Sequence, residues 1–471
     1  MIRLLHAYFP KRTLFLWISE GCLISLAFLT AMVARLGPST TVRMLNYQNG
    51  AIKILLVSGV IITCMYYFDL YDSSVLGNWR EGLIRLVQVL GTIYCASVFV
   101  YYLYPPLEFG RGIFAIGLLL VATLLFFWRK AFYLVNGAAQ FAERTLILGE
   151  GPLADLLQSE FVSRPELGLR VVGRIRVDGN GNNQFNHQDK SASDRYLTDM
   201  ADSLCRDVNS LRVSRIVVAM GERRGNLPVE RLLALKCSGV HVQDGADVYE
   251  TITGKVPIES VRLASLLFSP GCHASRIHLI YKRFAAVVFS VTGLILSLPL
   301  LPFIVAAIAL TSRGPILYRQ RRVGRNGVVF YCYKFRTMRA DAEADIGPTW
   351  AADEDPRITP VGKFLRKSRM DEIPQLWNVL RGDMSMVGPR PERPEFVEEL
   401  SREIPFYQLR HTIRPGISGW AQVRYKYGST VEDAKEKLRY DLYYVKNMSM
   451  GLDLLICFNT VKIILLGRGA K

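Results

Sequence analysis

Hydrophobic positions dominate the N-terminal end of the chain in four separate runs, at about 14–34, 51–70, 83–104 and 113–135. Each run is close to the ~20 apolar residues that a helix needs to cross a bilayer. The pattern therefore predicts four transmembrane helices, packed as a bundle, within residues 1–140.

Basic residues flank this set on both outer sides: Arg3, Lys11 and Arg12 precede the first run, and Arg129, Lys130 and Arg144 follow the fourth. An excess of Lys and Arg is typical of the cytoplasmic side of transmembrane helices. Basic residues in the first loop oppose this orientation: Arg35, Arg43 and Lys53. Since an even number of crossings returns the chain to its starting side, we still expect both ends of the bundle in the cytoplasm.

After the fourth run, short apolar stretches alternate with amphipathic ones. The segment "RTLILGEGPLADLLQSEF" indicates a strand, a glycine turn and a helix, and "LRVVGRIRVDG" and "VSRIVVAMG" indicate further strands. This succession predicts a Rossmann-like α/β module over residues 141–270. Gly149, Gly151 and Ala154 fit a GxGxxG/A diphosphate turn, but Pro152 removes a backbone N–H from it. We therefore favour a degenerate scaffold for packing, dimerisation or regulation over a dinucleotide-binding site.

A fifth hydrophobic run covers residues 281–311 and is also long enough to span a membrane. Pro299 and Pro302 lie near its middle, and proline removes a helix hydrogen bond and clashes with the preceding turn. One interpretation is an ordinary kinked spanning helix. The other is a re-entrant helix that leaves on the face it entered, with polar side chains such as Ser297 satisfying the freed backbone groups.

Composition supports a membrane protein with an anionic partner. The 471 residues are half hydrophobic, yet the formal net charge is +17. This combination is common in membrane proteins with basic cytoplasmic parts, and it indicates nucleic acid, anionic lipid or a phosphorylated substrate as partner. Eight cysteines without a CxxC spacing, and six histidines without a ligand spacing, argue against a zinc site.

Positive charge is densest directly after the last hydrophobic run. Between Arg313 and Arg339 there are eight Lys or Arg, interspersed with aromatic residues, and no acid. Nucleic-acid binding uses such mixtures. Next to a membrane segment, however, a membrane-interface and phosphate-binding surface is the simpler explanation, and we expect no nucleic-acid partner. Lys334 and Arg336, two residues apart, would share one face of a strand.

The stretch "KSRMDEIPQLWNVLRGDMSMVGPRP" places two adjacent carboxylates, Asp371 and Glu372, in basic surroundings. It predicts a helix that starts at Asp371, and such a pair at a helix start usually serves as a cap. The helix dipole, Arg366 and Arg369 would also keep the carboxylates ionised. An ionised carboxylate among cations is a nucleophile that can meet a phosphate, and its neighbour can hold Mg²⁺. Arg390, between two prolines, suits bidentate phosphate contact.

Residues from about 278 to 471 resemble the catalytic domain of bacterial polyprenyl-phosphate sugar-1-phosphate transferases, the phosphoglycosyl transferases of the bacterial sugar transferase family. The resemblance rests on "GPILYRQRRVGRNG", "YKFRTM", "RKSRMDEIPQLWNVLRGDMSMVGPRP", "RPGISGWAQV" and "KLRYDLYYVKN". The part before them resembles the large members of this family, and "GPRPERPEFVEEL" resembles the exopolysaccharide-associated subgroup. The resemblance thus covers nearly the whole chain.

The resemblance implies a fold and a location. The expected fold is a membrane protein with a four-helix transmembrane bundle, a Rossmann-like α/β module and an α-rich monotopic transferase domain at 271–471 with a re-entrant helix at 281–311. The expected location is the bacterial inner membrane, multi-pass, with the catalytic domain on the cytoplasmic face. The usual Ser-Pro break reads Leu298-Pro299 here, with Ser297 and Pro302 nearby.

The resemblance also implies a reaction: sugar-1-phosphate passes from a UDP-sugar to undecaprenyl phosphate, releasing UMP, as the first membrane step of exopolysaccharide or related glycan synthesis. Asp371 would form a covalent phosphosugar intermediate, and Glu372 would bind Mg²⁺, or Mn²⁺ in its place. Further residues match family positions around the phosphates: Lys334, Arg336, Arg366, Arg390 and Asp441.

Three other functions compete with this interpretation. A membrane-anchored nucleotide-sugar dehydratase or epimerase of the short-chain type needs a YxxxK pair, and residues 144–270 contain none. An inactive polysaccharide-assembly scaffold would not need Asp371, Glu372 and Arg390 intact. Direct attack by the lipid phosphate, without a covalent intermediate, stays open. We also expect contact with membrane lipid and a homodimer formed through the membrane helices or the α/β module.

Overall fold

The computed structural model describes residues 2–4, 7–47, 49–72, 75, 79–105, 110–137, 142–164, 167–177, 183–186, 208, 210–220, 227, 229–260, 276–339, 355–425, 428 and 430–466. Internal contacts divide the chain into two compact units, one built mainly from Phe9–Gly245 and one mainly from Ala246–Lys471. Two short strands near the N-terminus, β1 (Ile2–Leu4) and β2 (Ala7–Phe9), form a two-stranded sheet.

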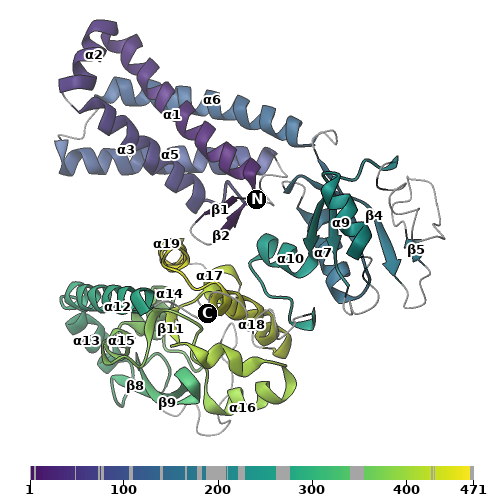
Figure 1. Cartoon of the computed structure of the whole chain (residues 1–471). Helices are drawn as coiled ribbons and strands as arrows, with labels where there is room; N and C mark the ends of the chain where they lie inside the picture. The colour runs from purple at the N-terminus through teal and green to yellow at the C-terminus, as the bar shows by residue number, and fades with distance from the viewer. Residues whose placement is uncertain are drawn as a thin grey trace. The chain divides into compact units, whose positions relative to one another are not determined.

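The first unit begins with apolar helices, which Figure 1 draws in purple and blue. They are α1 (Lys11–Leu36), α2 (Pro38–Tyr47), α3 (Gly50–Tyr67), α5 (Trp79–Leu103) and α6 (Arg111–Gly137). The four predicted runs are therefore helices, and α2 is an addition that the hydrophobic pattern did not predict. Among the described residues, five helices are long and apolar enough to cross a membrane: α1, α3, α5, α6 and the later α12.

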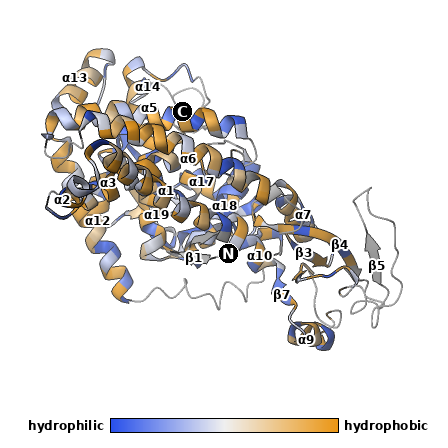
Figure 2. Cartoon of the chain, turned by 90° about the horizontal axis from the view of Figure 1, so that it is seen from above, coloured by the Kyte–Doolittle hydropathy of each residue, from blue (hydrophilic) through white to orange (hydrophobic). Residues whose placement is uncertain are grey.

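One apolar core joins α1, α3, α5 and α6, with fully buried Phe28, Ile61, Val89 and Val121 among its members. The outward faces are apolar as well, as the orange colour of these helices in Figure 2 shows. Leu55 on α3, for example, is 67% exposed. Helices that are hydrophobic on all sides are typical of a membrane environment, so the N-terminal helices are those of a membrane protein.

A polar cluster interrupts this core. Glu20 is fully buried and accepts hydrogen bonds from Arg129 Nε at 2.6 Å and Tyr71 Oη at 2.6 Å. Arg129 also donates to the carbonyl of Leu70 at 3.1 Å. The single acid of the first apolar run is thus paired and fastens α1 to α6, as a buried charge requires.

The rest of the first unit is an α/β module. Its sheet has the order β5-β4-β3-β6-β7, parallel except for β5. Its elements are β3 (Glu143–Leu148), α7 (Pro152–Ser163), β4 (Leu169–Val177), β5 (Asn183–Asn186), β6 (Arg215–Val218), α9 (Val229–Cys237) and β7 (His241–Asp244). The structure therefore confirms the predicted α/β part.

The glycine turn after β3 has a packing role. Gly149 has φ +123°, and a Cβ there would lie 2.8 Å from the backbone of Ala219, just after β6. Gly151 precedes α7, and Pro152 is its first residue. The turn therefore needs glycine for close approach to the neighbouring strand, whatever it binds.

The second unit holds the remaining elements. They are α10 (Gly245–Thr253), which begins at the unit boundary, η4 (Ile258–Ser260), α12 (Arg276–Ser297), α13 (Leu301–Thr311), β8 (Leu317–Val323), η6 (Arg325–Gly327), β9 (Val329–Phe335), α14 (Pro360–Lys367), η7 (Met370–Glu372), α15 (Gln375–Arg381), β10 (Ser385–Val387), α16 (Pro394–Glu403), η8 (Tyr407–Thr412), β11 (Gly416–Ser418), α17 (Trp420–Arg424), α18 (Val431–Lys446) and α19 (Met450–Leu466). The β8–β9 hairpin is antiparallel and β10 pairs with β11 in parallel.

The predicted break in the fifth hydrophobic run is present. Helix α12 ends at Ser297 and α13 begins at Leu301, with Pro299 between them. The amide of Leu300 bonds the carbonyl of Ser297 at 2.9 Å, a tighter turn than an α-helix makes. The Ser297 hydroxyl donates to Leu294 O at 2.8 Å, within its own helix. The path of these two arms through a membrane stays a prediction.

Residues 246–260, which we call the strap, belong with the second unit. Val256 and Ile258 are buried in the same core as Tyr443 and Leu438 of α18. Three strap side chains form ion pairs with α18: Glu250 with Lys446, Lys255 with Glu436, and Glu259 with Arg439. The α18 helix thus packs against a segment that precedes α12 and α13 in the sequence.

This packing predicts where the transferase part can be cut. A chain that begins at Ala246 should be more stable than one that begins at Arg276. Burying Val256 and Ile258 is worth roughly 1.5–3 kcal/mol each. Thermal unfolding of both chains in the same detergent measures the difference, and equal midpoints would show that the strap contributes nothing.

Candidate active site

The acid pair lies in the short turn η7, not at the start of an α-helix. The predicted N-cap role of Asp371 is wrong, because α15 begins at Gln375, preceded by Pro374, which offers no side-chain cap. Arg369 precedes the pair with φ 59° and ψ 14°, a left-handed backbone that costs a non-glycine residue about 1 kcal/mol or more. This conformation turns the chain so that both carboxylates enter the interior.

Both arms of the broken apolar helix hold this turn. Arg283 of α12 donates to the last carbonyls of α15, at Val379 and, over 2.7 Å, at Leu380. On the other side, Ile304 and Ile308 of α13 form an apolar cluster with residues of α14 and β9, and two residues that flank the acid pair pack against it: Met370 and Ile373. Both apolar helices therefore contact the segments on either side of the acid pair.

Asn378 fixes the strand beside the acid pair. This fully buried residue of α15 donates from Nδ2 to Tyr331 O at 2.7 Å and accepts from Tyr333 N at 3.1 Å. Its amide thus extends the hydrogen bonding of β9 to α15. The next residue along β9 is Lys334, whose side chain reaches the acid pair.

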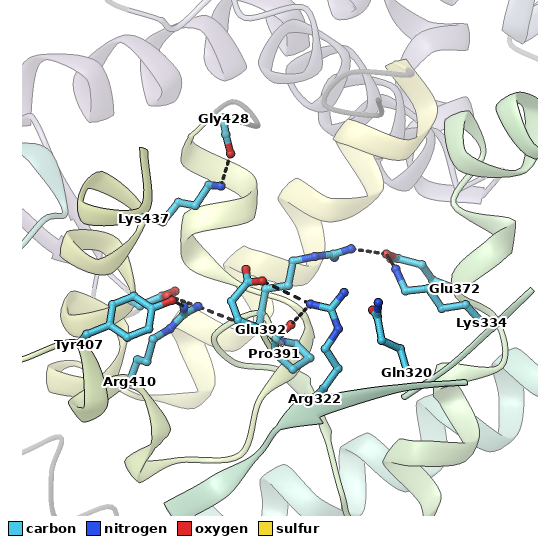
Figure 3. A network of polar contacts seen from close by, with 12 residues as sticks. Gln320, Arg322, Lys334, Glu372, Pro391, Glu392, Tyr407, Arg410, Gly428 and Lys437 are labelled. Carbon is cyan, nitrogen blue, oxygen red and sulfur yellow. Dashed lines mark hydrogen bonds and ion pairs between the residues drawn. The ribbon is translucent and has the colours of Figure 1, made fainter. Parts of the chain in front are cut away.

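Glu372 is enclosed by cations, as Figure 3 shows for Lys334. Its Oε1 accepts from Arg390 Nη2 at 2.8 Å and Lys334 Nζ at 3.2 Å, and Arg369 Nη1 lies 3.7 Å away. Burial alone raises the pKa of Glu372, but Arg390, Lys334 and Arg369 outweigh it and hold that pKa well below its usual range. Glu372 is therefore a fixed anion.

Asp371 differs from its neighbour. It is 6% exposed, and its Oδ1 has no hydrogen-bond partner among the residues the structure describes. Burial raises the pKa of Asp371, and the negative charge of Glu372 raises it further. The positive charges of Lys334, Arg390 and Arg366 lower it. The net shift is upward, so this carboxylate is the more basic of the two and keeps an oxygen free for chemistry.

The other predicted phosphate ligands lie at different distances from the pair. Arg366, at the end of α14, donates from Nε to Thr337 Oγ1 at 2.9 Å and lowers the pKa of Asp371. Arg336 follows the end of β9 and donates from Nη2 to Ser312, the residue after α13. The structure therefore brings Lys334, Arg366 and Arg390 to the acid pair, whereas Arg336 contacts Ser312 at the end of α13.

Asp441 is deeply buried on α18 and pairs with Arg410, whose Nη2 lies 2.8 Å from its Oδ2. Burial raises the pKa of Asp441 to about 6, with Arg410 opposing the rise. The sequence already indicated Arg369 as a cation beside the pair, but sequence reasoning missed Asn378 and Arg410, because their roles come from contacts with distant segments.

Comparison with known proteins identifies the family. The sequence model described as "Bacterial sugar transferase" matches residues 277–467. The chain is 42% identical over 270 residues to the UDP-N-acetylgalactosamine-undecaprenyl-phosphate N-acetylgalactosaminephosphotransferase of Aeromonas hydrophila, covering 56% of this chain and 62% of that protein. It is 32% identical over 324 residues to the UDP-glucose:undecaprenyl-phosphate glucose-1-phosphate transferase of Klebsiella pneumoniae, covering 68% and 67%. The chain belongs to the bacterial sugar transferase family.

A third relative, the exopolysaccharide production protein PSS of Rhizobium leguminosarum bv. phaseoli, is 42% identical over 191 residues, which is 39% of this chain and 94% of that protein. The chain spans about two thirds of the length of the first two relatives. The segment that the family model matches contains the acid pair, the cations around it and Asp441.

Proposed function

We propose that this protein transfers sugar-1-phosphate from a UDP-sugar to undecaprenyl phosphate and releases UMP, as a step of exopolysaccharide or related glycan synthesis. The observation that carries the proposal is the asymmetry of the acid pair: Asp371 has a free, basic oxygen, while Glu372 is held ionised by Lys334 and Arg390. The names of the relatives supply the two substrates.

The proposed chemistry has two displacements at one phosphorus. An Asp371 oxygen attacks the sugar-linked phosphorus, a P–O bond forms, and the bond to the second phosphate breaks with UMP leaving as an anion. An oxygen of undecaprenyl phosphate then attacks the same phosphorus and Asp371 leaves as a carboxylate. Lys334, Arg390 and Arg366 supply the positive charge that lets an anionic nucleophile approach a diphosphate.

The site suits a divalent cation that takes ligands from the protein and from the substrate together. The described residues contain no group of three or more His, Cys, Asp or Glu side chains placed for a metal. Mg²⁺ commonly binds through one or two carboxylates together with substrate phosphates, which suits Glu372 beside the partner-free oxygen of Asp371. Bound there, Mg²⁺, or Mn²⁺ in its place, would neutralise charge on the diphosphate.

We further propose that α1, α3, α5 and α6 cross the bacterial inner membrane as a four-helix bundle, and that α12 and α13 form a re-entrant helix. The support is their length and apolar surface, and the break at Pro299. In this topology the second unit and the α/β module lie in the cytoplasm, where nucleotide sugars occur. The basic flanks of the bundle favour the same orientation.

The reaction predicts UMP as product and Asp371 as the labelled residue. Membranes given undecaprenyl phosphate, Mg²⁺ and a panel of UDP-linked glucose, galactose and N-acetylated sugars should release UMP with at least one of them. Without lipid, labelled sugar-phosphate should stay on the peptide that contains Asp371. Asp371→Asn should lower turnover by about 10³-fold or more, because an amide cannot carry the phosphosugar.

Other outcomes point to the competing functions. Release of UDP would indicate ordinary glycosyl transfer, and no nucleotide release with any sugar would favour a scaffold. UMP release with a clean Asp371 peptide would favour direct attack by the lipid phosphate. A changed UDP-sugar without UMP would indicate a dehydratase or epimerase.

The cations around Asp371 predict the pH dependence of transfer. The reaction needs ionised Asp371, whose pKa lies above its ordinary value, so kcat/KM should fall as pH drops through that raised pKa. Lys334 lowers this pKa, and Lys334→Met should therefore move the acid limb of the profile to higher pH. Lys363→Met, a change on the same unit, serves as control. An acid limb that stays in place in Lys334→Met would contradict this assignment.

The topology predicts which introduced cysteines react in intact cells. In a cysteine-free chain, Tyr47→Cys, between the first two crossings, should react with a membrane-impermeant maleimide. Arg402→Cys on α16 should react only after permeabilisation. Both native side chains are well exposed, at 86% and 75%. Labelling of Arg402→Cys in intact cells would place the transferase part outside and exclude the re-entrant helix.

A further inference from the structure

Arg390 reaches Glu372 from a loop whose backbone carbonyls all accept hydrogen bonds. We call residues 389–392, between β10 and α16, the arginine loop. Its four consecutive carbonyls each accept a hydrogen bond. Pro389 O accepts from Gly416 N at 2.9 Å and Glu392 O from Val323 N at 2.9 Å. The two central carbonyls, of Arg390 and Pro391, accept from side chains instead.

Arg410 holds the first of the central carbonyls. Its Nη2 donates to Arg390 O at 3.0 Å and lies 2.8 Å from Asp441 Oδ2, while its Nη1 donates to Tyr407 Oη at 2.6 Å. Arg410 and Asp441 are both almost completely buried. The carboxylate and the phenol thus fix the guanidinium in one orientation, aimed at the backbone of Arg390.

Arg322 holds the second carbonyl from the opposite side, as Figure 3 shows. Its Nη1 donates to Pro391 O at 2.9 Å and lies 3.3 Å from Glu392 Oε2. Arg322 comes from β8 and Arg410 from η8, so two distant segments converge on one loop.

The charges of the two holding arginines are balanced. Arg410 has Asp441 and Arg322 has Glu392, so each holder carries its own counter-ion. A balanced, buried guanidinium attracts a phosphate weakly, whereas Arg390 points its charge at the acid pair. The prolines on both sides of Arg390 have no N–H and restrict the backbone further.

We propose that Arg410 with Asp441, and Arg322 with Glu392, are positioning pairs that fix Arg390 beside Glu372, and that they do not themselves bind a phosphate. This inference rests on the proposed function and gives Asp441 a role through Arg410 and the arginine loop. It makes Arg390 a residue whose action depends on four side chains outside the acid pair, of which Arg410 and Asp441 are buried.

The test is a mutational cycle in the full-length chain. Arg410→Met with Asp441→Leu removes both charges of the buried pair, a replacement that folded proteins tolerate better than the loss of one partner. This double change should lower the kcat/KM of UMP release roughly tenfold to hundredfold, about what loss of a charged hydrogen bond produces. In an Arg390→Ala background the same change should have less than about a twofold further effect, because its action passes through Arg390.

A matched control is the exposed pair Glu398–Arg402 on α16 of the same unit. Arg402→Met with Glu398→Leu should leave kcat/KM unchanged. Arg322→Met gives an independent second cycle, because this side chain lies nearer the surface and its loss threatens folding less. Effects that multiply with Arg390→Ala in either cycle would overturn the proposal.

Hydrogen–deuterium exchange separates the proposal from the proposed function. The peptide covering the arginine loop should exchange faster in the Arg410/Asp441 double variant and in Arg322→Met. Its exchange rate should be unchanged in the α16 control. This readout needs no substrate, so it holds even if UMP release fails. Unchanged exchange in both variants, or faster exchange with full activity, would show that these arginines do not position Arg390.

Discussion

Two carboxylates that are adjacent in sequence and both buried repel each other and lose their hydration. The surrounding residues of the transferase unit must offset this unfavourable energy. The structure resolves it by treating the two acids differently. Glu372 receives Arg390, Lys334 and Arg369, so it stays ionised despite burial. Asp371 receives none of these contacts on Oδ1, and its pKa moves the other way. Opposite shifts in two neighbouring acids are a usual way to separate chemical roles. The left-handed Arg369 precedes the turn η7, in which both carboxylates are buried.

The same constraint explains why the broken apolar helix is attached so directly. A turn that buries charge must be held from all sides, and here α12 supports α15 through Arg283 while α13 packs under Met370 and Ile373. Helices α12 and α13 therefore expose apolar surface on one side and pack against the residues that flank the acid pair on the other. A lipid substrate at a membrane surface would need no long path to such a site. Arg336, bonded to Ser312 at the end of α13, joins the strand that carries Lys334 to the same arm.

Much of this architecture could be predicted because it follows from periodicity and composition. Local patterns of hydrophobic, glycine and proline residues predict the four N-terminal helices, the α/β module and the break at Pro299. The cap assigned to Asp371 failed because the pair lies in the turn η7, where its neighbour Glu372 forms an ion pair with Lys334 of β9, more than thirty residues earlier in the chain. Two-residue spacing placed Lys334 and Arg336 on one face, but β9 ends at Phe335, and beyond it the rule no longer applies. Asn378 and Arg410 could not be found, since their importance lies in the backbone groups they contact.

The α18 helix shows how far the site reaches through the unit. It carries Asp441, and it is held on one side by the strap and on the other by Lys282 of α12, which contacts Tyr444. Burying an ion pair such as Asp441 with Arg410 is favourable only if its surroundings are rigid, because solvent entry would weaken the pairing and motion would break the geometry. Rigidity here comes from segments that precede and follow the pair by many residues. The strap lies before α12 in sequence, yet it packs against α18, which carries the Asp441 that pairs with Arg410. The position of one loop arginine therefore depends on packing between distant segments of the second unit, which the short motif that contains Asp371, Glu372 and Arg390 does not show.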